Sequence, residues 1–256
     1  MPGAMNSSPR EWDADTYDAI SDPQFNWGME VLGRLELRGD EVALDAGCGS
    51  GRVTAELAKR LPDGRLIAVD GSEAMVAKAR ERLGDGVTYL VADLSELAID
   101  DPVDLVFSTA TLHWVLDHDR LFARLRAALR SGGRLVAQCG GEGNVAEHAK
   151  VIAMVAARPE FAGHLGEMTG IWNFASAGET ESRLRRAGFS EIHCWLEPRP
   201  VQPDHPLEFT STVTLGPLLA QLPPQQRRPF AEAILVESDQ PLVLDYVRLN
   251  IEAVAA

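Results

Sequence analysis

Val42-Ala-Leu-Asp-Ala-Gly-Cys-Gly-Ser-Gly51 is the stretch of sequence that decides the fold. An apolar run ends in Asp45 and passes into three alternating glycines, and the helical pattern of residues 52–60 follows at once. A strand, a tight turn and a helix in this order open a nucleotide-binding βαβ unit. Glycines in the turn let the backbone approach a ligand at distances that a Cβ would block. An α/β protein with a ligand site behind its first strand is therefore expected.

The spacing of the glycines argues against a dinucleotide. The pattern G-x-G-x-x-G needs a glycine at 52 or at 54, where Arg52 and Thr54 stand. The carboxylate of Asp45 would also repel a pyrophosphate. A cofactor that carries adenosine and a positive charge but no phosphate fits better, and S-adenosylmethionine (SAM) is such a molecule.

Two more predicted strands end in an acid. Residues 65–70 end in Asp70, roughly where a Rossmann-type carboxylate binds the ribose hydroxyls. Residues 87–93 end in Asp93, whose carboxylate can accept a hydrogen bond from an adenine amino group. Open α/β sheets bind ligands at the carboxyl ends of their strands, so these acids are expected around one ligand. Further strands are predicted at residues 103–107, 134–138, 191–196 and 243–251, and helices at residues 73–83, 121–130, 145–157, 178–187, 207–221 and 224–238.

At this point the chain resembles the class I SAM-dependent methyltransferases. The matching segments are residues 44–51, 69–75, 91–94 and 125–135. The resemblance implies a Rossmann-like, seven-stranded and mostly parallel sheet with helices on both faces. It also implies SAM as the cofactor and S-adenosylhomocysteine as its product. The residues that it places at the cofactor are Asp45, Gly47, Cys48, Gly49, Gly51, Asp70, Gly71, Met75, Asp93, Leu94 and Ser108. Structural roles are the alternative for three of them, because Asp45 and Asp93 could cap turns and Met75 could fill the core.

The cofactor half is expected at about residues 40–140 of a single domain that runs over residues 11–256, behind a disordered tail of residues 1–10. An aromatic-rich segment at about residues 11–38 could fold over the cofactor as an N-terminal helical lid, or its aromatic side chains could simply anchor an arm. A helical insertion at about residues 203–239, before the last strand, is expected to cap the carboxyl edge of the sheet.

Composition narrows the choice of partners. The formal net charge of −14 disfavours nucleic acid and anionic membranes, which both require a basic surface. Cys48, Cys139 and Cys194 are widely spaced and predict neither a disulfide framework nor a zinc site, so a reducing cytoplasm is expected. No long apolar run marks a membrane span. A small-molecule substrate is therefore expected, while the oligomeric state stays open.

The loop Phe107-Ser-Thr-Ala-Thr-Leu-His-Trp-Val115 follows the fourth predicted strand, beside the expected place of the cofactor's methyl group. Its pair His113-Trp114 resembles the carboxylate-methylating branches of the family, above all the trans-aconitate methyltransferases, which also share Trp12 and Tyr17. This resemblance implies methyl transfer to a carboxylate oxygen. A carboxylate is already ionised at pH 7 and needs no general base, so His113 and Trp114 would donate hydrogen bonds to it. The alternatives are that Trp114 packs in the core under the cap and that His113 is a turn histidine bonded to the backbone. Trp12, Tyr17 and Trp114 are the residues expected at the substrate.

The predicted cap departs from those relatives at one position. Gly216 stands before a proline where the trans-aconitate methyltransferases tend to carry arginine. The cap region offers few cations, chiefly Arg199, Arg227 and Arg228, whereas a tricarboxylate would need several. A less charged and partly apolar acid is therefore expected as the acceptor.

Three alternatives stay open. The acceptor could be a hydroxyl, an amine or a carbon, in which case His113 becomes the candidate general base. The chain could also be a SAM-binding protein without transferase activity. A dehydrogenase is the most distant alternative, since Arg52 and Thr54 break its glycine pattern. No metal is expected, because His113 and His118 lack the i,i+4 spacing of a helical ligand pair.

Overall fold

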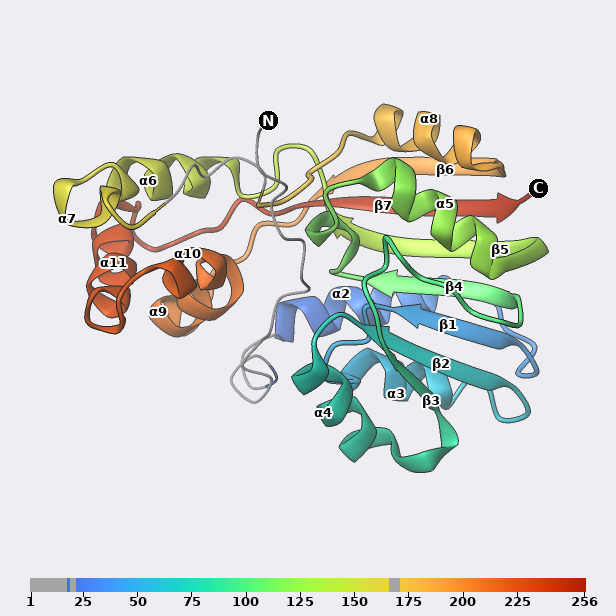
Figure 1. Ribbon diagram of the computed structural model, residues 1–256. Helices are drawn as coiled ribbons and strands as arrows, with labels where there is room; N and C mark the ends of the chain where they lie inside the picture. The colour runs from blue at the N-terminus through green and yellow to red at the C-terminus, as the bar shows by residue number, and fades with distance from the viewer. Residues whose placement is uncertain (1–17, 19–21, 166–170) are drawn as a thin grey trace, which may run out of the picture.

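Asp18 and residues 22–165 and 171–256 are the part of the chain that the computed structural model describes (Figure 1). They contain a seven-stranded sheet in the order β3-β2-β1-β4-β5-β7-β6. The strands are β1 (Val42–Ala46), β2 (Arg65–Asp70), β3 (Thr88–Val91), β4 (Val103–Thr109), β5 (Leu129–Gly140), β6 (Phe189–Pro198) and β7 (Val247–Ala255). β7 pairs antiparallel with β5 and β6, and the other pairs are parallel. The predicted mostly parallel sheet of seven strands with helices on both faces is confirmed.

The direction in which the sheet grows reverses at β1. This strand pairs with β2 on one side and with β4 on the other. The helices that follow β1 and β4 are α3 (Arg52–Ala58) and α5 (His118–Ala128), and they pack on opposite faces of the sheet. Such a reversal leaves a crevice at the carboxyl ends of the two strands, which is where open α/β sheets bind ligands.

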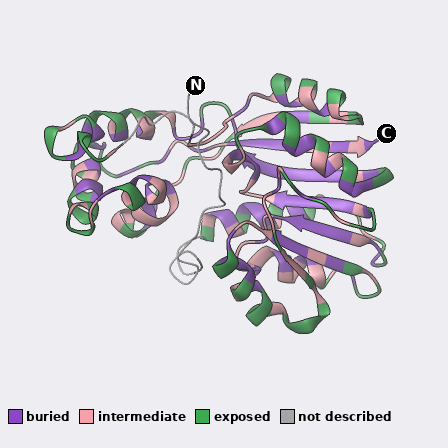
Figure 2. Ribbon diagram, in the orientation of Figure 1, coloured by how far each residue is buried: buried purple, intermediate pink, exposed green. Residues whose placement is uncertain are grey.

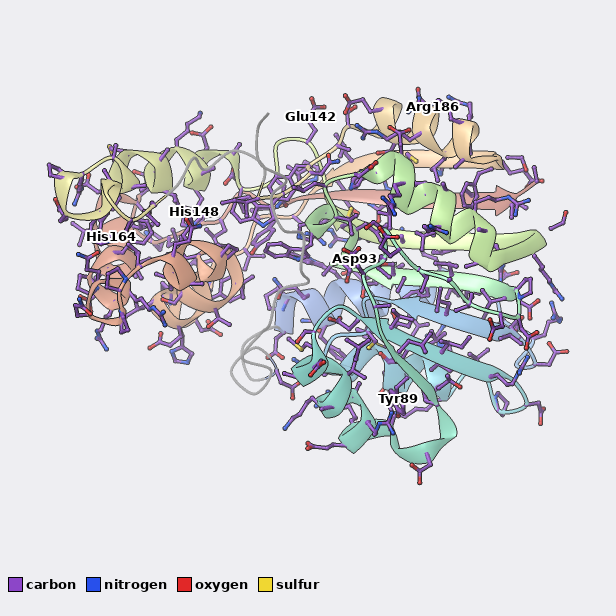
Figure 3. The ribbon with its side chains drawn as sticks, viewed as in Figure 1. Tyr89, Asp93, Glu142, His148, His164 and Arg186 are labelled. Carbon is purple, nitrogen blue, oxygen red and sulfur yellow. The ribbon has the colours of Figure 1, made fainter. Side chains whose placement is uncertain are left out.

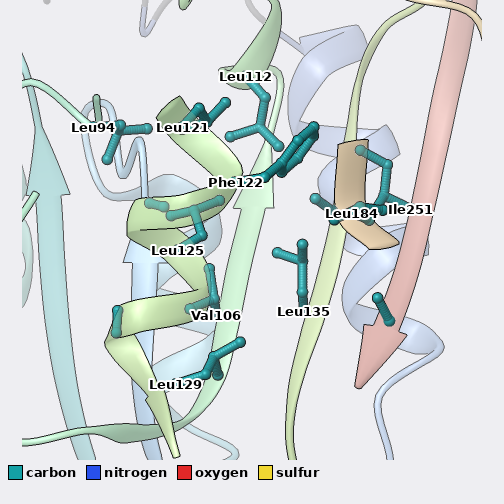
Figure 4. Close-up of a cluster of buried hydrophobic side chains, with 14 of the residues drawn as sticks. Leu94, Val106, Leu112, Leu121, Phe122, Leu125, Leu129, Leu135, Leu184 and Ile251 are labelled. Carbon is teal, nitrogen blue, oxygen red and sulfur yellow. The ribbon is translucent and has the colours of Figure 1, made fainter. Parts of the chain in front are cut away.

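One face of the sheet packs against α5 and α8 (Ala177–Ala187) (Figure 4). On α5 the apolar residues Leu121, Phe122 and Leu125 recur with helical spacing and lie on the same side of the helix. They are fully buried against strand residues that include Leu44 and Val106. Full burial of one such side chain contributes about 1.5–3 kcal/mol to the free energy of folding. The packing of α5 thus helps to fix the strands whose ends form the ligand crevice.

The other face packs against α2 (Asp22–Gly33), α3 and α4 (Glu73–Leu83). Val31 and Leu32 of α2 and Leu57 of α3 meet Leu105 and Phe107 of β4 in one buried cluster. Because alternate residues of β4 face opposite sides, burial on both sides explains the apolar run of residues 105–107 in this strand. Figure 2 shows the strands buried between the two helical layers and the outward faces of the helices exposed.

A helical lobe extends beyond the carboxyl ends of the parallel strands (Figure 1). Its helices are α6 (Ala146–Ala156), α7 (Pro159–Ala162), α9 (Pro206–Phe209), α10 (Gly216–Gln221) and α11 (Pro224–Glu237). They share a small apolar core that includes Ile152, Phe161, Leu218 and Phe230. The last three helices lie within the expected insertion at residues 203–239. They pack with α6 and α7 from the connection between β5 and α8, a segment that the sequence pattern does not assign to the cap.

The last strand differs from its expected range of residues 243–251. β7 begins at Val247 and runs on to Ala255, and Leu244 makes only an isolated bridge to Val201. The residues before β7 bind the start of α6 instead, because the Asp245 carboxylate accepts the backbone N–H of Glu147 at 2.9 Å. Asp245 thus binds the start of α6, while Leu244 and Tyr246 on either side of it keep backbone hydrogen bonds to Val201 and Arg199.

The helix expected at residues 207–221 is interrupted. Thr210–Thr214 forms a turn of π-helix between α9 and α10. The Thr214 hydroxyl donates to the Thr210 carbonyl at 3.0 Å, and Pro217, which has no backbone N–H, begins a new helix. Periodicity alone could not reveal this break, and π-turns of this kind are frequent at functional sites.

The start of α4 and the end of α8 lie where the sequence predicts, whereas α5 runs from His118 to Ala128 and not over the predicted residues 121–130, because Asp117 caps its start and Leu129 begins β5. The Ser72 side chain accepts the Met75 N–H at the start of α4, and the Asp117 side chain accepts the Arg120 N–H at the start of α5. Gly188 ends α8 with a φ of 91°. Short polar side chains at N-caps and glycine after the last turn are the signals that sequence reports most directly.

Candidate cofactor and acceptor site

A cavity of about 590 Å³, here called the large cavity, opens at the carboxyl ends of the parallel strands. Its described lining comes mainly from the ends of β1, β2, β3 and β4 and from the loops behind them. Gln24 and Phe25 of α2, Arg120 of α5, and Ile171 and Pro217 on the side of the helical lobe complete it. Figure 3 shows Asp93 at this edge of the sheet, facing the lobe. The crevice that the strand order creates is therefore a real hollow, and its acids come from three different strands.

The glycine loop after β1 has the backbone geometry that its sequence predicts. Gly47, Gly49 and Gly51 all have positive φ, at 94°, 52° and 81°. A Cβ on Gly47 would lie 2.1 Å from the Thr111 hydroxyl, so only glycine fits there. A Cβ on Gly49 would meet nothing within 4 Å, and this residue lines the large cavity. The loop thus presents bare backbone to the hollow.

Asp70 and Asp93 occupy the strand ends that the sequence predicts. The Asp70 carboxylate accepts the backbone N–H of Gly49 at 3.0 Å and that of Ser72 at 2.9 Å, which fixes it beside the glycine loop. The Asp93 carboxylate accepts the N–H of Ser95 at 2.8 Å. Both carboxylates line the large cavity, and each oxygen of a carboxylate has lone pairs for more than one donor.

Asp45 has a strongly raised pKa. Its side chain lies at the floor of the large cavity, almost wholly buried, and accepts a hydrogen bond from the Thr54 hydroxyl at 2.7 Å. Burial raises the pKa of Asp45 to about 7; the Thr54 hydrogen bond opposes this shift, and the neighbouring Asp70 adds to it. A positive charge in the cavity would reverse that effect by favouring the ionised carboxylate.

The other residues predicted at the cofactor divide into two groups. Cys48, Gly71, Met75 and Leu94 line the large cavity. Ser108 does not, because it is fully buried under the loop and its hydroxyl donates to the Ala46 carbonyl at 2.6 Å, where it ties β4 to β1. The residues that follow it, 109–111, line the cavity instead. Trp12 and Tyr17, predicted at the substrate, lie outside the described residues.

A second hollow of about 50 Å³, here called the small cavity, adjoins the large one. The two share Gln24, Ala110 and Trp114 in their linings. The described residues that line only the small cavity are His113, Asn144, Val145, Trp172, Phe174, Val213, Thr214, Tyr246 and Arg248. The loop after β4 is strained between the two hollows, because Ala110 has a φ of 56°, a region that a residue with a Cβ seldom adopts.

His113 is held as a neutral ring. It is buried at 7% exposure, and its Nδ1 accepts the backbone N–H of Gly140 at 3.3 Å. Burial holds the pKa of His113 well below its usual range, and the positive charges of Arg248 and His118 lower it further. With Nδ1 acting as an acceptor, the ring proton is assigned to Nε2, which has no hydrogen-bond partner among the described residues.

Aromatic rings form the wall around His113. Its ring stacks on Phe174 with centroids 5.6 Å apart, and Phe174 stacks on Trp172 at the same distance. Trp114 contacts both His113 and Trp172, at 5.1 Å and 5.9 Å. The sequence pattern pointed to His113 and Trp114 in this group. It missed Trp172 and Phe174, because only the fold brings the segment before α8 against the loop after β4.

The cations that the sequence suggested for the acceptor are engaged elsewhere. Arg199 forms ion pairs with glutamates, Arg227 donates to the Leu222 carbonyl at 3.1 Å, and Arg228 pairs with Glu232 on the same helix. None of these three arginines is in the described lining of either cavity. The small cavity holds a different one, the buried Arg248 of β7, whose guanidinium lies 4.6 Å from the centre of the Trp27 ring. Nothing in the local sequence distinguishes it from a surface arginine.

Asp18 connects the N-terminal part of the chain to the glycine loop. Its carboxylate accepts the Ser50 hydroxyl at 2.5 Å and forms an ion pair with Arg82 of α4 at 2.7 Å. Arg82 also donates to the Ser50 carbonyl, and Arg52 donates to the Asp18 carbonyl at 3.0 Å. These contacts hold the loop at Ser50, whereas Asp70 holds it at the Gly49 N–H.

The described residues contain neither a cluster suited to a metal ion nor a helix suited to span a membrane. No group of three or more His, Cys, Asp or Glu side chains within residues 22–165 and 171–256 is arranged to hold a metal ion. In the same part of the chain, no helix combines the length and the hydrophobicity that a membrane span requires.

Comparison with known proteins relates this site to an enzyme family. A family model described as a methyltransferase domain matches residues 43–133. A trans-aconitate 2-methyltransferase of Methylobacterium nodulans is 34% identical over 186 residues, which cover 73% of this chain and 67% of that relative. The protein of the same name from Acidovorax ebreus is 39% identical over 128 residues, which cover 50% of this chain and only 49% of the relative.

The fold is shared with a solved methyltransferase. The phosphoethanolamine N-methyltransferase 2 of Haemonchus contortus, in complex with phosphomonomethylethanolamine and S-adenosylhomocysteine, superimposes with a TM-score of 0.62. The match covers 94% of this chain and 56% of the other at 21% identity. At that identity the likeness establishes the fold.

Proposed function

Because the chain belongs to the class I SAM-dependent methyltransferases, we propose that it transfers a methyl group from SAM to a carboxylate oxygen of a small-molecule acid and so forms a methyl ester. The names of the relatives support an acid as the acceptor. The buried His113, whose Nδ1 accepts the Gly140 N–H in the wall of the small cavity, supports it independently, and this contact carries the proposal.

The large cavity suits SAM. The open space beside Gly49 lets the backbone meet the methionine part, and the fixed carboxylate of Asp70 would hold the ribose hydroxyls. Asp93 would accept from the adenine amino group, and the buried Asp45 would face the positive charges of the ligand. When bound, SAM supplies an electrophilic methyl group, which a carboxylate oxygen accepts without having to lose a proton.

The geometry of His113 separates the possible acceptors. A hydroxyl or an ammonium group must lose a proton to a base, which needs an available lone pair and a pKa near the working pH. In His113 the Nδ1 lone pair accepts from Gly140, and the pKa is far below that range. Its Nε2–H can donate a hydrogen bond to a carboxylate, which is ionised throughout the physiological range. The residue thus suits an acceptor that must be oriented rather than deprotonated.

Catalysis would then rest on orientation and exclusion of water. His113 and Trp114 belong to one short loop whose backbone is tied to the segment before α8, because the Asn173 N–H donates to the His113 carbonyl at 2.9 Å. The aromatic wall removes bulk water from the acceptor side, and holding two reactants in line can supply several kcal/mol of the barrier reduction.

The test is product chemistry. The protein is incubated with methyl-labelled SAM and a panel of small carboxylic acids, phenols and amines, and the products are treated with alkali. Label released as methanol identifies a methyl ester and supports the proposal. Label that stays in the product through alkali treatment contradicts it and points to methylation of a hydroxyl, an amine or a carbon.

A variant of His113 tests the same point in the protein. His113→Gln keeps a hydrogen-bond donor near the position of Nε2 but cannot act as a base, whereas His113→Ala removes both. Ester formation is expected to fall less than about tenfold in the glutamine variant and further in the alanine variant, since loss of a general base costs about 10²–10⁴. His164→Gln, on the exposed outer side of the lobe (Figure 3), is the matched control. Equal losses above a hundredfold in both His113 variants would contradict the assignment.

A further inference from the structure

Arg248 is the one cation among the described residues that line the small cavity, where His113 is neutral. It belongs to the start of β7 and is only 2% exposed. A guanidinium presents its donors in a planar fork that matches the two oxygens of a carboxylate. The small cavity therefore combines a cation with a neutral histidine donor, and it adjoins the large cavity through the shared residues Gln24, Ala110 and Trp114.

The two cavities differ in charge. The acids in the described lining of the large cavity are Asp45, Asp70, Asp93, Glu96 and Asp117. The two arginines of that lining are both ion-paired, Arg52 with Asp22 and Arg120 with Glu96. The large cavity is thus negative, which suits a positively charged cofactor and repels additional carboxylates.

The small cavity limits what can enter it. Its volume is about 50 Å³, against about 590 Å³ for the large cavity, so it suits the carboxylate head of an acid whose body extends into the larger hollow. The apolar surface available to that body includes Trp114, which lines both cavities, Trp172 and Val213 of the small cavity, and Ile171 and Pro217 of the large one. An acceptor whose head occupies the small cavity would therefore rest its body on apolar surface.

The geometry points to Arg248 as the residue that binds the acceptor's carboxylate, and to acids with a single ionised carboxylate on an apolar body as the substrate class. This inference rests on the proposed function. A tricarboxylate such as trans-aconitate would place two further negative charges on the apolar wall or against the acids of the large cavity. The substrate class thus differs from the one in the names of the relatives.

The test measures binding and turnover separately, with the full chain saturated with S-adenosylhomocysteine for binding. Calorimetry compares benzoic, cinnamic and hexanoic acids with benzamide and cinnamamide and with trans-aconitate. Monocarboxylic acids are expected to bind at least about thirtyfold more tightly than the matching amides, and more tightly than trans-aconitate. Because this comparison uses the unmodified protein, it does not depend on the folding of any variant.

Variants then assign the effect to the residue. Arg248→Gln is expected to weaken binding of the acids at least about thirtyfold and to leave binding of the amides within about threefold. Arg248→Lys should weaken binding of the acids by less than Arg248→Gln does but by more than threefold, because lysine keeps the charge but loses the planar fork. Arg199→Gln, which removes a cation outside both cavities, is the control and should match the parent. Thermal unfolding shows whether each variant is folded.

The outcomes of these tests distinguish the role of Arg248 from the proposed ester formation. Acid binding that is unchanged in Arg248→Gln, preferential binding of trans-aconitate, or no binding of any monocarboxylic acid would overturn the role of Arg248. Turnover decides the proposed function on its own, since alkali-stable methylation refutes ester formation whatever the acids do at Arg248. Ester formation that is independent of Arg248 leaves the proposed function intact and refutes the further inference.

Discussion

Replacing Asp45 by asparagine should change the stability of the protein and its binding of SAM in opposite directions. The carboxylate is buried beside Asp70 and its pKa is raised to about 7, so the folded protein holds a proton that the unfolded chain releases near pH 4. As the pH rises from about 4 to 7, the folded state therefore loses stability. Asparagine is neutral and can still accept the hydrogen bond from Thr54.

The size of both effects follows from the pKa. A shift from 3.8 to about 7 corresponds to about 4 kcal/mol at pH 8, which is the most that Asp45→Asn can add to the free energy of unfolding of the ligand-free protein. If SAM binds only the form with an ionised Asp45, its affinity rises about tenfold between pH 6 and pH 8, because the ionised fraction rises by that factor. The asparagine variant should bind SAM more weakly and without this pH dependence.

Two assays decide the matter. Denaturant unfolding at pH 5, 6, 7 and 8 gives the stability difference, which should grow with pH, and calorimetry over the same range gives the SAM affinity. Asp63→Asn, an exposed aspartate away from the cavity, serves as the control and should follow the parent in both. A parent protein whose SAM affinity is flat from pH 6 to 8, or an asparagine variant that is less stable than the parent at pH 8, would refute the reasoning.

Two further changes probe the loop that presents the cofactor site. Gly47→Ala places a Cβ on a residue with a φ of 94° and 2.1 Å from Thr111. We therefore expect the free energy of unfolding to fall by more than about 2 kcal/mol and SAM binding to be largely lost. Gly86→Ala is the control, because a Cβ there meets open space, and its free energy of unfolding should stay within about 1 kcal/mol of the parent's in the same assay. Arg82→Ala removes the side chain that joins Asp18 to Ser50 of the glycine loop, so SAM affinity measured by calorimetry should fall at least threefold. Arg80→Ala is the control, because Arg80 lies on the same helix but contacts the ring of Tyr89, and this variant should bind SAM as the parent does. Equal affinities in the two arginine variants would contradict the idea that this clamp orders the loop.

The cofactor half could be predicted from sequence because its signals are local. An acid at the end of an apolar run and glycines with fixed spacing determine where Asp45, Gly47 and Gly49 lie, and the helix after them follows from its own periodicity. Parallel strands then bring Asp70 and Asp93 to the same edge without further information.

The acceptor side could not be predicted in the same way, because its residues meet only through tertiary packing. Trp172 and Phe174 precede α8, while the π-helical turn that supplies Val213 and Thr214 reads as part of an ordinary helix. Arg248 stands in a strand whose pattern gives no sign of a buried charge. Ser108 differs from its prediction in the opposite way. The sequence places it at the cofactor, whereas in the structure its hydroxyl binds the Ala46 carbonyl and joins β4 to β1.

The antiparallel course of β7 has an evolutionary consequence. Because this strand runs against its neighbours, it contributes its beginning, and not its end, to the edge where the parallel strands finish. Residues assigned here to the cofactor therefore come from the first half of the chain, and the arginine assigned to the acceptor comes from the last strand. In evolution, a substitution at Arg248 can therefore change how the acceptor is bound while the strand ends that carry Asp45, Asp70 and Asp93 stay as they are.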